Sequence, residues 1–521
     1  MKNKRILLGL SILGAVMVLL YVGLPRYAAF RVRAAIAPYV ASTDSLDLTI
    51  DLFDGHVAFY NATVQVPADQ QTHTPAVNCL VDTLSIDGLS VFQFVFKGAI
   101  VADKVLLRAR DIGVDIDRTD STSTTHEREK KRTKKRDVRV GELDLQLVEL
   151  ACNVLGEDTM QLSMDSVVFA GTDFELAHTG GRIQPHVTIS SVVLSGNELL
   201  TGTGYRAFVE RVAARKNGAE LIVSNATFRP LMEMKEFSNT LAYETDVFDV
   251  AVDTVSVTGF DLERWFVDGS FQVNAVRVAR TEITVLRDKT IQDGPVVIMP
   301  LLGTLVRKMP QGSNVERVTI KDLTAVYHER ADRERGFAIM PFNHINGEVT
   351  LAQYSTTGPR LMVLDATCTT FGDADLRLHL ETNVNDTTDK FKINASMGVM
   401  PFQVLNMAMG PLADVTATQG TIDTLIYVLD ADDWFASGSV YIAYRDLKLT
   451  TSGTAKADLK EKFVNALLNA VVHQKGRNAK GEPRNGNFTM DRRRDRAIFN
   501  YLWSGLREGV KEVLLPKVIT K

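Results

Sequence analysis

Apolar and polar residues alternate along much of the chain, a pattern typical of strands with one apolar and one polar face. In "DLRLHLE", Leu376, Leu378 and Leu380 share one side, and in "FKINASM" Phe391 and Ile393 do the same. Further stretches of this kind are "LDLTIDL" from residue 46, "LDLQLVEL" from residue 143 and "LIVSNATF" from residue 221. The alternation therefore predicts a mainly β protein built from many such strands.

Turn-forming residue pairs punctuate these strands. Each pair ends in glycine, which tolerates the positive φ that tight turns require. The pairs are Asp54-Gly55, Asp87-Gly88, Ser195-Gly196, Asn346-Gly347 and Ser437-Gly438. We therefore expect a long antiparallel meander.

Part of the chain is repeated. The stretch Val81–Asp117, which begins "VDTLSIDGL", aligns without a gap on Val252–Asp288, which begins "VDTVSVTGF", with ten identities in thirty-seven positions. Looser versions of the opening recur as "VGELDLQLV" from residue 140 and "VERVTIKDL" from residue 315. Repeats bury their apolar faces against one another, so we expect growth along one axis. We place Asp82 and Asp253 on the wet side of their strands.

Helical periodicity is confined to a few segments. "YRAFVERVAARK" from Tyr205 predicts a short helix on the sheet, and Leu459–Val471 predicts an amphipathic one. A second amphipathic helix is expected over 497–515. We expect both C-terminal helices to cap the open end of the sheet, and contact with a membrane or partner is the alternative. The candidate contact residues are Phe499, Trp503, Leu506 and Val510.

The segment Ile6–Leu24 is nineteen residues without a charge. At about 1.5 Å per residue it reaches roughly 28 Å, close to the thickness of a bilayer core. We favour a retained anchor over a cleaved signal peptide, whose apolar region is shorter. The expected topology is a five-residue cytoplasmic head, a single membrane pass and an exported body. The anchor is represented by Ile6, Leu10, Leu13, Val16, Leu20 and Leu24.

Charge and cysteine content narrow the functional classes. The net charge of −4 gives no electrostatic reason to expect nucleic acid as a partner. The basic stretch 120–137 is expected to be a solvated loop, and contact with anionic lipid is the alternative. Three widely spaced cysteines, Cys79, Cys152 and Cys368, favour buried free thiols over a disulfide framework.

Local motifs for catalysis are weak. His328-Glu329 lacks the second histidine of a zinc-protease helix, because residue 332 is Asp. "TGTGY" from Thr201 carries only two glycines of a nucleotide-binding loop. The acidic stretch "DADDWF", with Asp430, Asp432 and Asp433, favours a hairpin loop over a calcium site. We therefore expect no enzyme activity, metal or cofactor.

Several stretches together resemble the AsmA-like proteins, relatives of TamB and of the bridge-like lipid-transfer proteins. They are the N-terminal anchor, the repeated β units, "VTIKDLTAVYHER", "FNHINGEVTLA", "LDATCTTFGDADLRLHLE", "MPFQVLNMAMGPL", "SGSVYIAYRDLKL" and "FNYLWSGLREGVKEVL". The resemblance implies an elongated, twisted, U-shaped antiparallel β-groove with an apolar concave face. It carries over no catalytic residues.

The resemblance also implies a function and a location. The protein would hang from the inner membrane into the periplasm and conduct phospholipid toward the outer membrane, with acyl chains along the groove. The candidate groove-lining residues are Leu376, Leu378, Leu380, Phe391 and Ile393. The alternative is a factor that assembles outer-membrane proteins, with an outer-membrane protein as partner. The expected organisation is head 1–5, anchor 6–24, first β block 25–119, basic loop 120–137, continuing groove 138–455 and helical segment 456–521.

Overall fold

A computed structural model describes residue 30 and residues 47–51, 54–68, 75–90, 93–97, 99–117, 138–155, 159–179, 182–351, 359–451 and 484–514. The expected anchor Ile6–Leu24, the basic stretch 120–137 and the expected helix Leu459–Val471 lie outside these residues. Within the described ranges, no helix is long and apolar enough to cross a membrane. The chain divides into two compact units, residues 1–223 and 224–521.

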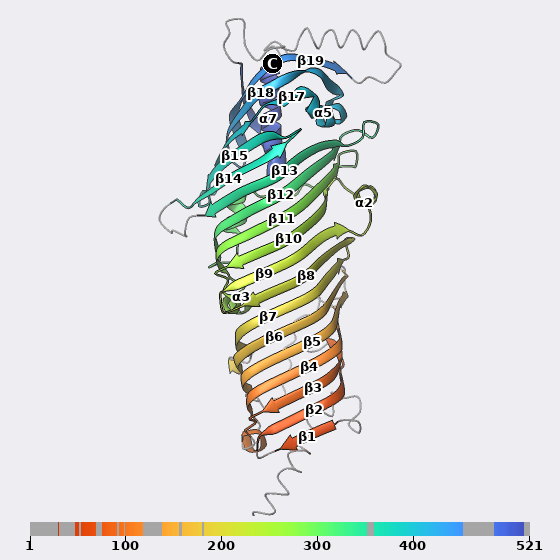
Figure 1. The fold of residues 1–521 in the computed structure, drawn as a ribbon, viewed down its shortest axis with the longest axis vertical. Helices are drawn as coiled ribbons and strands as arrows, with labels where there is room; N and C mark the ends of the chain where they lie inside the picture. The colour runs from red at the N-terminus through yellow and green to blue at the C-terminus, as the bar shows by residue number, and fades with distance from the viewer. Residues whose placement is uncertain are drawn as a thin grey trace, which may run out of the picture. The chain divides into compact units, whose positions relative to one another are not determined.

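The described chain is mainly β, and its strands form a large mixed sheet. In the first unit, consecutive strands are hydrogen-bonded neighbours from β1 to β8 (Figure 1). Its elements are β1 (Asp47–Asp51), β2 (His56–Val66), β3 (Ala76–Asp87), the short helix η1 (Gln93–Lys97), β4 (Ile100–Asp117), β5 (Val138–Leu155), β6 (Met160–Thr179), β7 (Arg182–Thr201) and β8 (Tyr205–Arg215). The division between the units falls within β9 (Glu220–Pro230).

The second unit also consists of hydrogen-bonded strands, and it contains several helices. Its first half holds α2 (Met234–Thr240), β10 (Asp246–Thr258), α3 (Leu262–Asp268), β11 (Gln272–Asp288), α4 (Leu302–Arg307), β12 (Asn314–Arg330), β13 (Ala338–Leu351) and β14 (Leu361–Thr370). The second half holds β15 (Ala374–Asn383), β16 (Phe391–Met397), β17 (Met400–Pro401), η2 (Phe402–Leu405), α5 (Asn406–Ala413), β18 (Val415–Ala431), β19 (Phe435–Thr451), β20 (Asn485–Asp491) and α7 (Ile498–Leu514).

The internal repeat is confirmed as a structural unit. In both copies an antiparallel strand pair encloses a short helical element: β3, η1 and β4 in the first, β10, α3 and β11 in the second. In both copies the second strand then pairs in parallel with the next strand, β4 with β5 and β11 with β12. The prediction of a purely antiparallel meander was therefore wrong. A parallel pair needs a long crossover connection, which in the second copy is residues 289–313.

The expected helix from Tyr205 was also wrong, because the segment is β8. It pairs with β7 from Leu200↔Arg206 to Ser191↔Arg215. Period two was hidden because the alternation is interrupted at Glu210, opposite Gly196, which has a positive φ of 59°. Ala207 and Val212 therefore share a face although they are five residues apart. Pairing with a neighbouring strand overrides such weak local patterns.

Two of the five expected turns are turns, at Asp54-Gly55 and Asp87-Gly88, where both glycines have positive φ. The other three pairs lie inside strands β7, β13 and β19, so those predictions were wrong. Gly438 shows the reason, because a Cβ there would lie 2.3 Å from the carbonyl oxygen of Val428. Close packing between strands, and not a turn, requires the missing side chain.

The C-terminal part holds one strand and one helix in its described residues. β20 lies within the segment 456–521, which was expected to be helical, and it pairs with β19. The predicted helix over 497–515 is confirmed as α7, which packs on β19 and β20. It covers the largest core of the second unit, where Tyr501 and Val513 are 3% and 0% exposed.

Candidate functional site: an apolar face across the strands

The first unit carries an apolar face made of cross-strand rows. Each row takes one residue from each of β2 to β8, following the hydrogen-bonded register. One row is Ala62, Val81, Ala109, Leu147, Val167, Leu194 and Val212. A second is Phe59, Leu84, Leu107, Leu145, Phe169, Val192 and Ala214, and a third is Val66, Val77, Val114, Cys152, Leu162, Leu199 and Ala207. We call this surface the apolar face.

Exposure changes along the apolar face. Near the start of the unit the residues form a packed core, with Val57, Phe59 and Ala109 at 3%, 6% and 3% exposed. On β5 to β7 the corresponding side chains, such as Val167 and Leu194, remain partly exposed. This part of the face is therefore accessible to an apolar ligand.

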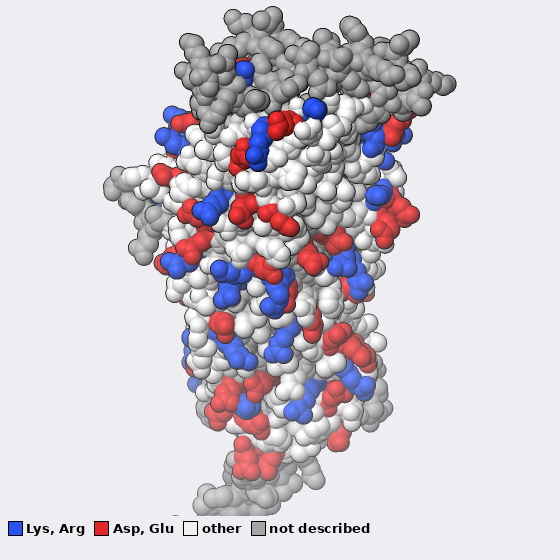
Figure 2. Space-filling view, turned by 45° about the horizontal axis from the view of Figure 1, so that its top comes forward, with Lys and Arg blue, Asp and Glu red and all other residues white. Residues whose placement is uncertain are grey.

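The opposite face of the same strands carries the charged residues. Between the apolar rows lies the outward row Tyr60, Thr83, Arg108, Gln146, Val168, Val193 and Ala213, which is polar on β2 to β5 and apolar on β6 to β8. Cross-strand ion pairs such as Arg110–Asp82, at 2.9 Å between Nε and Oδ1, lie in solvent. Charges of both signs are intermingled on the surface shown in Figure 2. The sheet is thus two-sided, with a wet face and an apolar one.

Bulges keep the apolar residues on one face of these long strands. Asp111 on β4 and its neighbour Glu149 on β5 both have positive φ, at 52° and 55°. Each inserts an extra residue, so that Ala109 and Ile112 share a face although they are three apart in sequence. The bulge residues project polar groups, and a hydrogen bond with Asp111 raises the pKa of the Glu149 carboxyl.

The second unit repeats the apolar face but covers part of it. One row is Val257, Val276, Val318, Val349, Leu364, Leu380, Ile393, Leu429, Gly438 and Phe488. From Leu364 onward the row belongs to the core beneath α7. A Cβ on Gly509 of α7 would lie 2.3 Å from Val440 Cγ2, so the helix lies directly on the strands.

The five candidate groove-lining residues lie on this face but mostly in its covered part. Leu380, Phe391 and Ile393 are 2%, 4% and 0% exposed. Leu378 is partly buried and packs against the same core, and Leu376 is also partly buried. α7 and the strands therefore enclose most of the predicted lining.

The four candidate contact residues of α7 also turn largely toward the sheet. Trp503, Leu506 and Val510 pack against the core, partly buried. Phe499 is 39% exposed, and its ring lies 5.3 Å from that of Tyr327. In the described structure the helix covers the apolar face of its own unit, whereas it was expected to cap the open end of the sheet.

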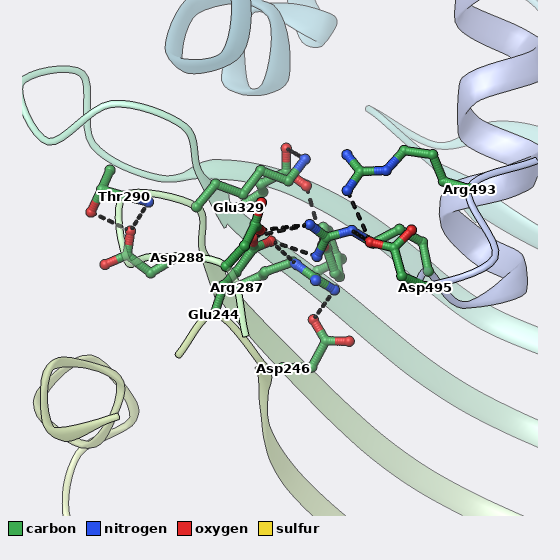
Figure 3. A network of polar contacts seen from close by, with 12 residues as sticks. Glu244, Asp246, Arg287, Asp288, Thr290, Glu329, Arg493 and Asp495 are labelled. Atoms are coloured by element: carbon green, nitrogen blue, oxygen red, sulfur yellow. Dashed lines mark hydrogen bonds and ion pairs between the residues drawn. The ribbon is translucent and has the colours of Figure 1, made fainter. Parts of the chain in front are cut away.

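A buried ionic network fixes the start of α7 to the strands (Figure 3). Glu244, with a side chain only 4% exposed, accepts from Arg287 Nε at 2.5 Å and from both terminal nitrogens of Arg496 at 3.0 and 3.2 Å. Arg287 also donates to Asp246 at 3.1 Å, and Arg496 to Asp293 at 2.9 Å. Burial raises the pKa of Asp246, and the positive charge of Arg287 opposes this.

A second part of the network lies at the crossover that follows β11. The Asp288 side chain, 0% exposed, pairs with Arg330 and accepts from the Thr290 amide at 2.9 Å and hydroxyl at 2.7 Å. Burial alone would raise the pKa of Asp288, but these hydrogen bonds hold it below its usual range. Lys289 Nζ contacts Glu329 at 2.6 Å. No sequence motif indicated this network, because its members come from four separate segments.

The acidic stretch at the turn between β18 and β19 is used structurally. Asp432 Oδ1 accepts from the amides of Trp434 and Phe435 at 2.8 and 2.9 Å. Asp433 is paired with Arg492 and Arg494. In the part of the chain that the structure describes, no three His, Cys, Asp or Glu side chains are grouped to hold a metal ion.

The three cysteines are free thiols, as expected. Each is only partly buried, whereas full burial was expected. Cys79, Cys152 and Cys368 all lie on the apolar side of their strands, since Cys79 belongs to the first core and the other two align with Leu162 and Leu376. Burial raises the pKa of Cys79, and raises that of Cys368 to about 11.

A cavity with a volume of about 1210 Å³ lies between α4 and the start of β12. Its lining includes Arg307, whose guanidinium donates to the carbonyls of Val384 and Asp386 at 2.9 and 2.8 Å and to Asp389 at 2.7 Å. That arginine is already engaged, so it offers no free charge to an anionic ligand.

No protein-family model matches the sequence, and no curated protein matches it. The apolar face is thus the feature on which a functional argument has to rest.

Proposed function

We propose that the chain binds phospholipid acyl chains on the apolar face and conducts lipid between the inner and outer membranes. The observation that carries the proposal is the set of three seven-residue apolar rows across β2 to β8, partly exposed on β5 to β7. Burying apolar surface of this kind is worth about 0.8 kcal/mol for each CH₂ group of a ligand.

The accessible part of the face is comparable to one acyl chain. Two intervals of about 4.8 Å separate β5 from β7, so the partly exposed part of the rows extends for about 10 Å. The hydrocarbon core of a bilayer, which holds two acyl chains end to end, is about 30 Å thick, or about 15 Å for each chain. The exposed rows can therefore contact most of one acyl chain.

The rows also suit movement along the face. Residues of similar apolar character recur at every strand, so an acyl chain that advances by one strand exchanges one set of contacts for an equivalent set. Dispersion and hydrophobic contacts are not directional. Lipid can then advance without breaking specific hydrogen bonds, which agrees with a conduit and with the expected anchored, periplasmic location.

Photocrosslinking from neighbouring residues of one strand tests the proposal. A benzoylphenylalanine at Val167 lies in an apolar row, whereas one at Val168, 41% exposed, lies on the polar face. Leu147 and Val148 form a second such pair on β5. We expect labelled phospholipid to crosslink in the full chain at Val167 and Leu147 but not at Val168 and Val148.

Equal labelling on both faces, or none at Val167 and Leu147, would contradict a lipid-binding role. Crosslinks from the edge strand β1 or from Trp503 to outer-membrane polypeptides, in place of lipid, would instead favour the role in outer-membrane protein assembly. The experiment therefore separates the two functions by the chemical nature of the crosslinked species.

A further inference from the structure

The second unit carries an exposed apolar patch that belongs to no core. Its members are Val296, Val297, Ile298, Met299, Trp434 and Phe435, which are 83%, 60%, 57%, 40%, 64% and 45% exposed. Four of them are consecutive in the crossover between β11 and β12, and two are at the turn between β18 and β19. Contiguous exposed apolar surface marks an interaction site, unlike single scattered residues.

Two arginines hold the two segments of the patch together. The Met299 amide donates to the carbonyl oxygen of Arg494 at 2.9 Å, and Arg492 donates to the Met299 carbonyl at 2.6 Å. The Arg492 amide in turn donates to the Trp434 carbonyl at 2.7 Å. The Arg494 guanidinium lies 3.9 Å from the centre of the Trp434 ring. The patch is therefore one built surface.

The crossover segment is held on both sides of its apolar run. Before the run, the Glu244 amide donates to the Gln292 carbonyl at 2.8 Å, and Asp293 pairs with Arg496. After the run, Leu301 is 1% exposed in the core. Four large apolar side chains are thus presented outward by a fixed backbone, so a partner need not order them on binding.

The composition of the patch fits the headgroup layer of a bilayer. Tryptophan is enriched at membrane interfaces, where its apolar ring and polar N–H meet lipid and water. Pro295 and Pro300, which flank the run, have no backbone N–H, and the Met299 amide is already bonded. Few donors would therefore lose their water on shallow insertion.

The charges around the patch have both signs. The side chains of Arg493 and Asp293 are 63% and 72% exposed. A zwitterionic headgroup offers a phosphate to the first and an ammonium group to the second. A surface of one sign would instead have favoured an anionic membrane.

We propose that this patch docks the second unit on a phospholipid bilayer by shallow insertion of Val296–Met299 and Trp434. The inference goes beyond acyl-chain binding, because it concerns a different surface and contact with an intact membrane. A chain that binds lipid on the apolar face could lack bilayer docking, and the reverse is equally true.

Vesicle flotation of the full chain tests the docking surface. The protein is held in nanodiscs and mixed with vesicles of phosphatidylethanolamine and phosphatidylcholine, which float while nanodiscs do not. We expect Val297→Asp to weaken flotation at least about tenfold, equivalent to about 1.4 kcal/mol. Val399→Asp is the matched control, since Val399 is 64% exposed in the same unit but outside the patch.

Ile298→Asp serves as a second variant, and thermal unfolding of each variant checks that the fold is retained. Binding should persist at about 1 M salt, where the Debye length is about 3 Å and electrostatic contacts are screened. The inference is overturned if the wild-type chain does not float, if salt releases it, or if Val297→Asp and Val399→Asp behave alike. Loss of crosslinking on the apolar face with flotation intact would count only against lipid conduction.

Discussion

The hydroxyl of Tyr427 on β18 donates a hydrogen bond to the backbone carbonyl oxygen of Leu502 on α7, at 3.1 Å. A tyrosine of the apolar face thereby fixes the helix that covers the face. The contact is made possible by glycine in the next turn of the helix, because a Cβ on Gly505 would lie 2.5 Å from the same hydroxyl. Covering of the face in the second unit is therefore specified by sequence.

Enlarging Gly509 should loosen α7. A Cβ there would meet Val440 Cγ2 at 2.3 Å, and overpacking of this kind costs about 1 to 3 kcal/mol. The gain of about 1 kcal/mol in helix propensity on Gly509→Ala offsets part of that cost, so Gly509→Val should have the larger effect. Hydrogen exchange along α7 and thermal unfolding measure the result.

Arg507→Ala is the control on the same helix, because the Arg507 side chain is 57% exposed. An exposed substitution should change stability by no more than about 0.5 kcal/mol. Equal protection of α7 in Gly509→Val and Arg507→Ala would show that the close packing of the helix is not needed.

Removing Glu244 should destabilise the second unit strongly. Its side chain is 4% exposed and lies between Arg287 and Arg496, whose side chains are 12% and 11% exposed. Glu244→Ala leaves these buried cations short of a partner, at a cost of about 3 to 5 kcal/mol. Glu508→Ala, in an exposed pair with Lys511, is the control and should be nearly neutral. Denaturant unfolding compares them, and similar midpoints would contradict the structural role of the network.

Much of the fold follows from local patterns. Most of the stretches in which apolar and polar residues alternate form strands in the structure. The repeat predicted from ten identities corresponds to a strand, helical element and strand in both copies. Asp82 and Asp253 were correctly placed in solvent, because each pairs with an arginine of the neighbouring strand, Arg110 and Arg280. Patterns that depend on a single strand and its two faces are thus readable from sequence.

What depends on pairing could not be predicted in this way. The parallel pairs arise from which strand follows a crossover, and no local residue type encodes that choice. Gly196, Gly347 and Gly438 were mistaken for turns because the same residue serves turns and close strand packing. The network around Glu244 joins residues up to 252 positions apart, so its members carry no spacing signal.

Acid should weaken the contribution that Asp288 makes to the stability of the fold. Its folded-state pKa lies below the usual value, so the carboxylate stabilises the fold at neutral pH. That contribution decreases as pH falls below about 3.9, the unfolded value, and through the folded-state pKa. Asp246 acts in the opposite sense, because its raised pKa favours the protonated form in the folded chain.

Comparing the wild-type chain with Asp288→Asn isolates the stabilisation that the ionised Asp288 carboxylate provides. The variant should be less stable than the wild-type chain at pH 7, and the difference should narrow toward pH 3. Urea unfolding at a series of pH values measures both chains. A difference that stays constant or widens in acid would mean that ionisation of Asp288 does not stabilise the fold.

The native cysteines report on occupancy of the apolar face. Cys152 is partly exposed in a row that includes Val114 and Leu162, and an acyl chain in that row would cover its thiol. Phospholipid should therefore slow modification of Cys152 by a maleimide severalfold in the full chain. Cys368, with a pKa of about 11, should react slowly with or without lipid because little thiolate forms near neutral pH.

Ala151→Cys in a Cys152→Ser background provides the matched control for this protection. Residue 151 is exposed and adjacent to 152, but successive residues of a strand point to opposite faces. Its thiol should react at the same rate whether or not lipid is present, as mass spectrometry of the labelled peptide would measure. If lipid protects position 151 as well as position 152, the lipid shields the whole protein and not the apolar face alone. If lipid protects neither position, the acyl chains bind elsewhere than on the apolar face.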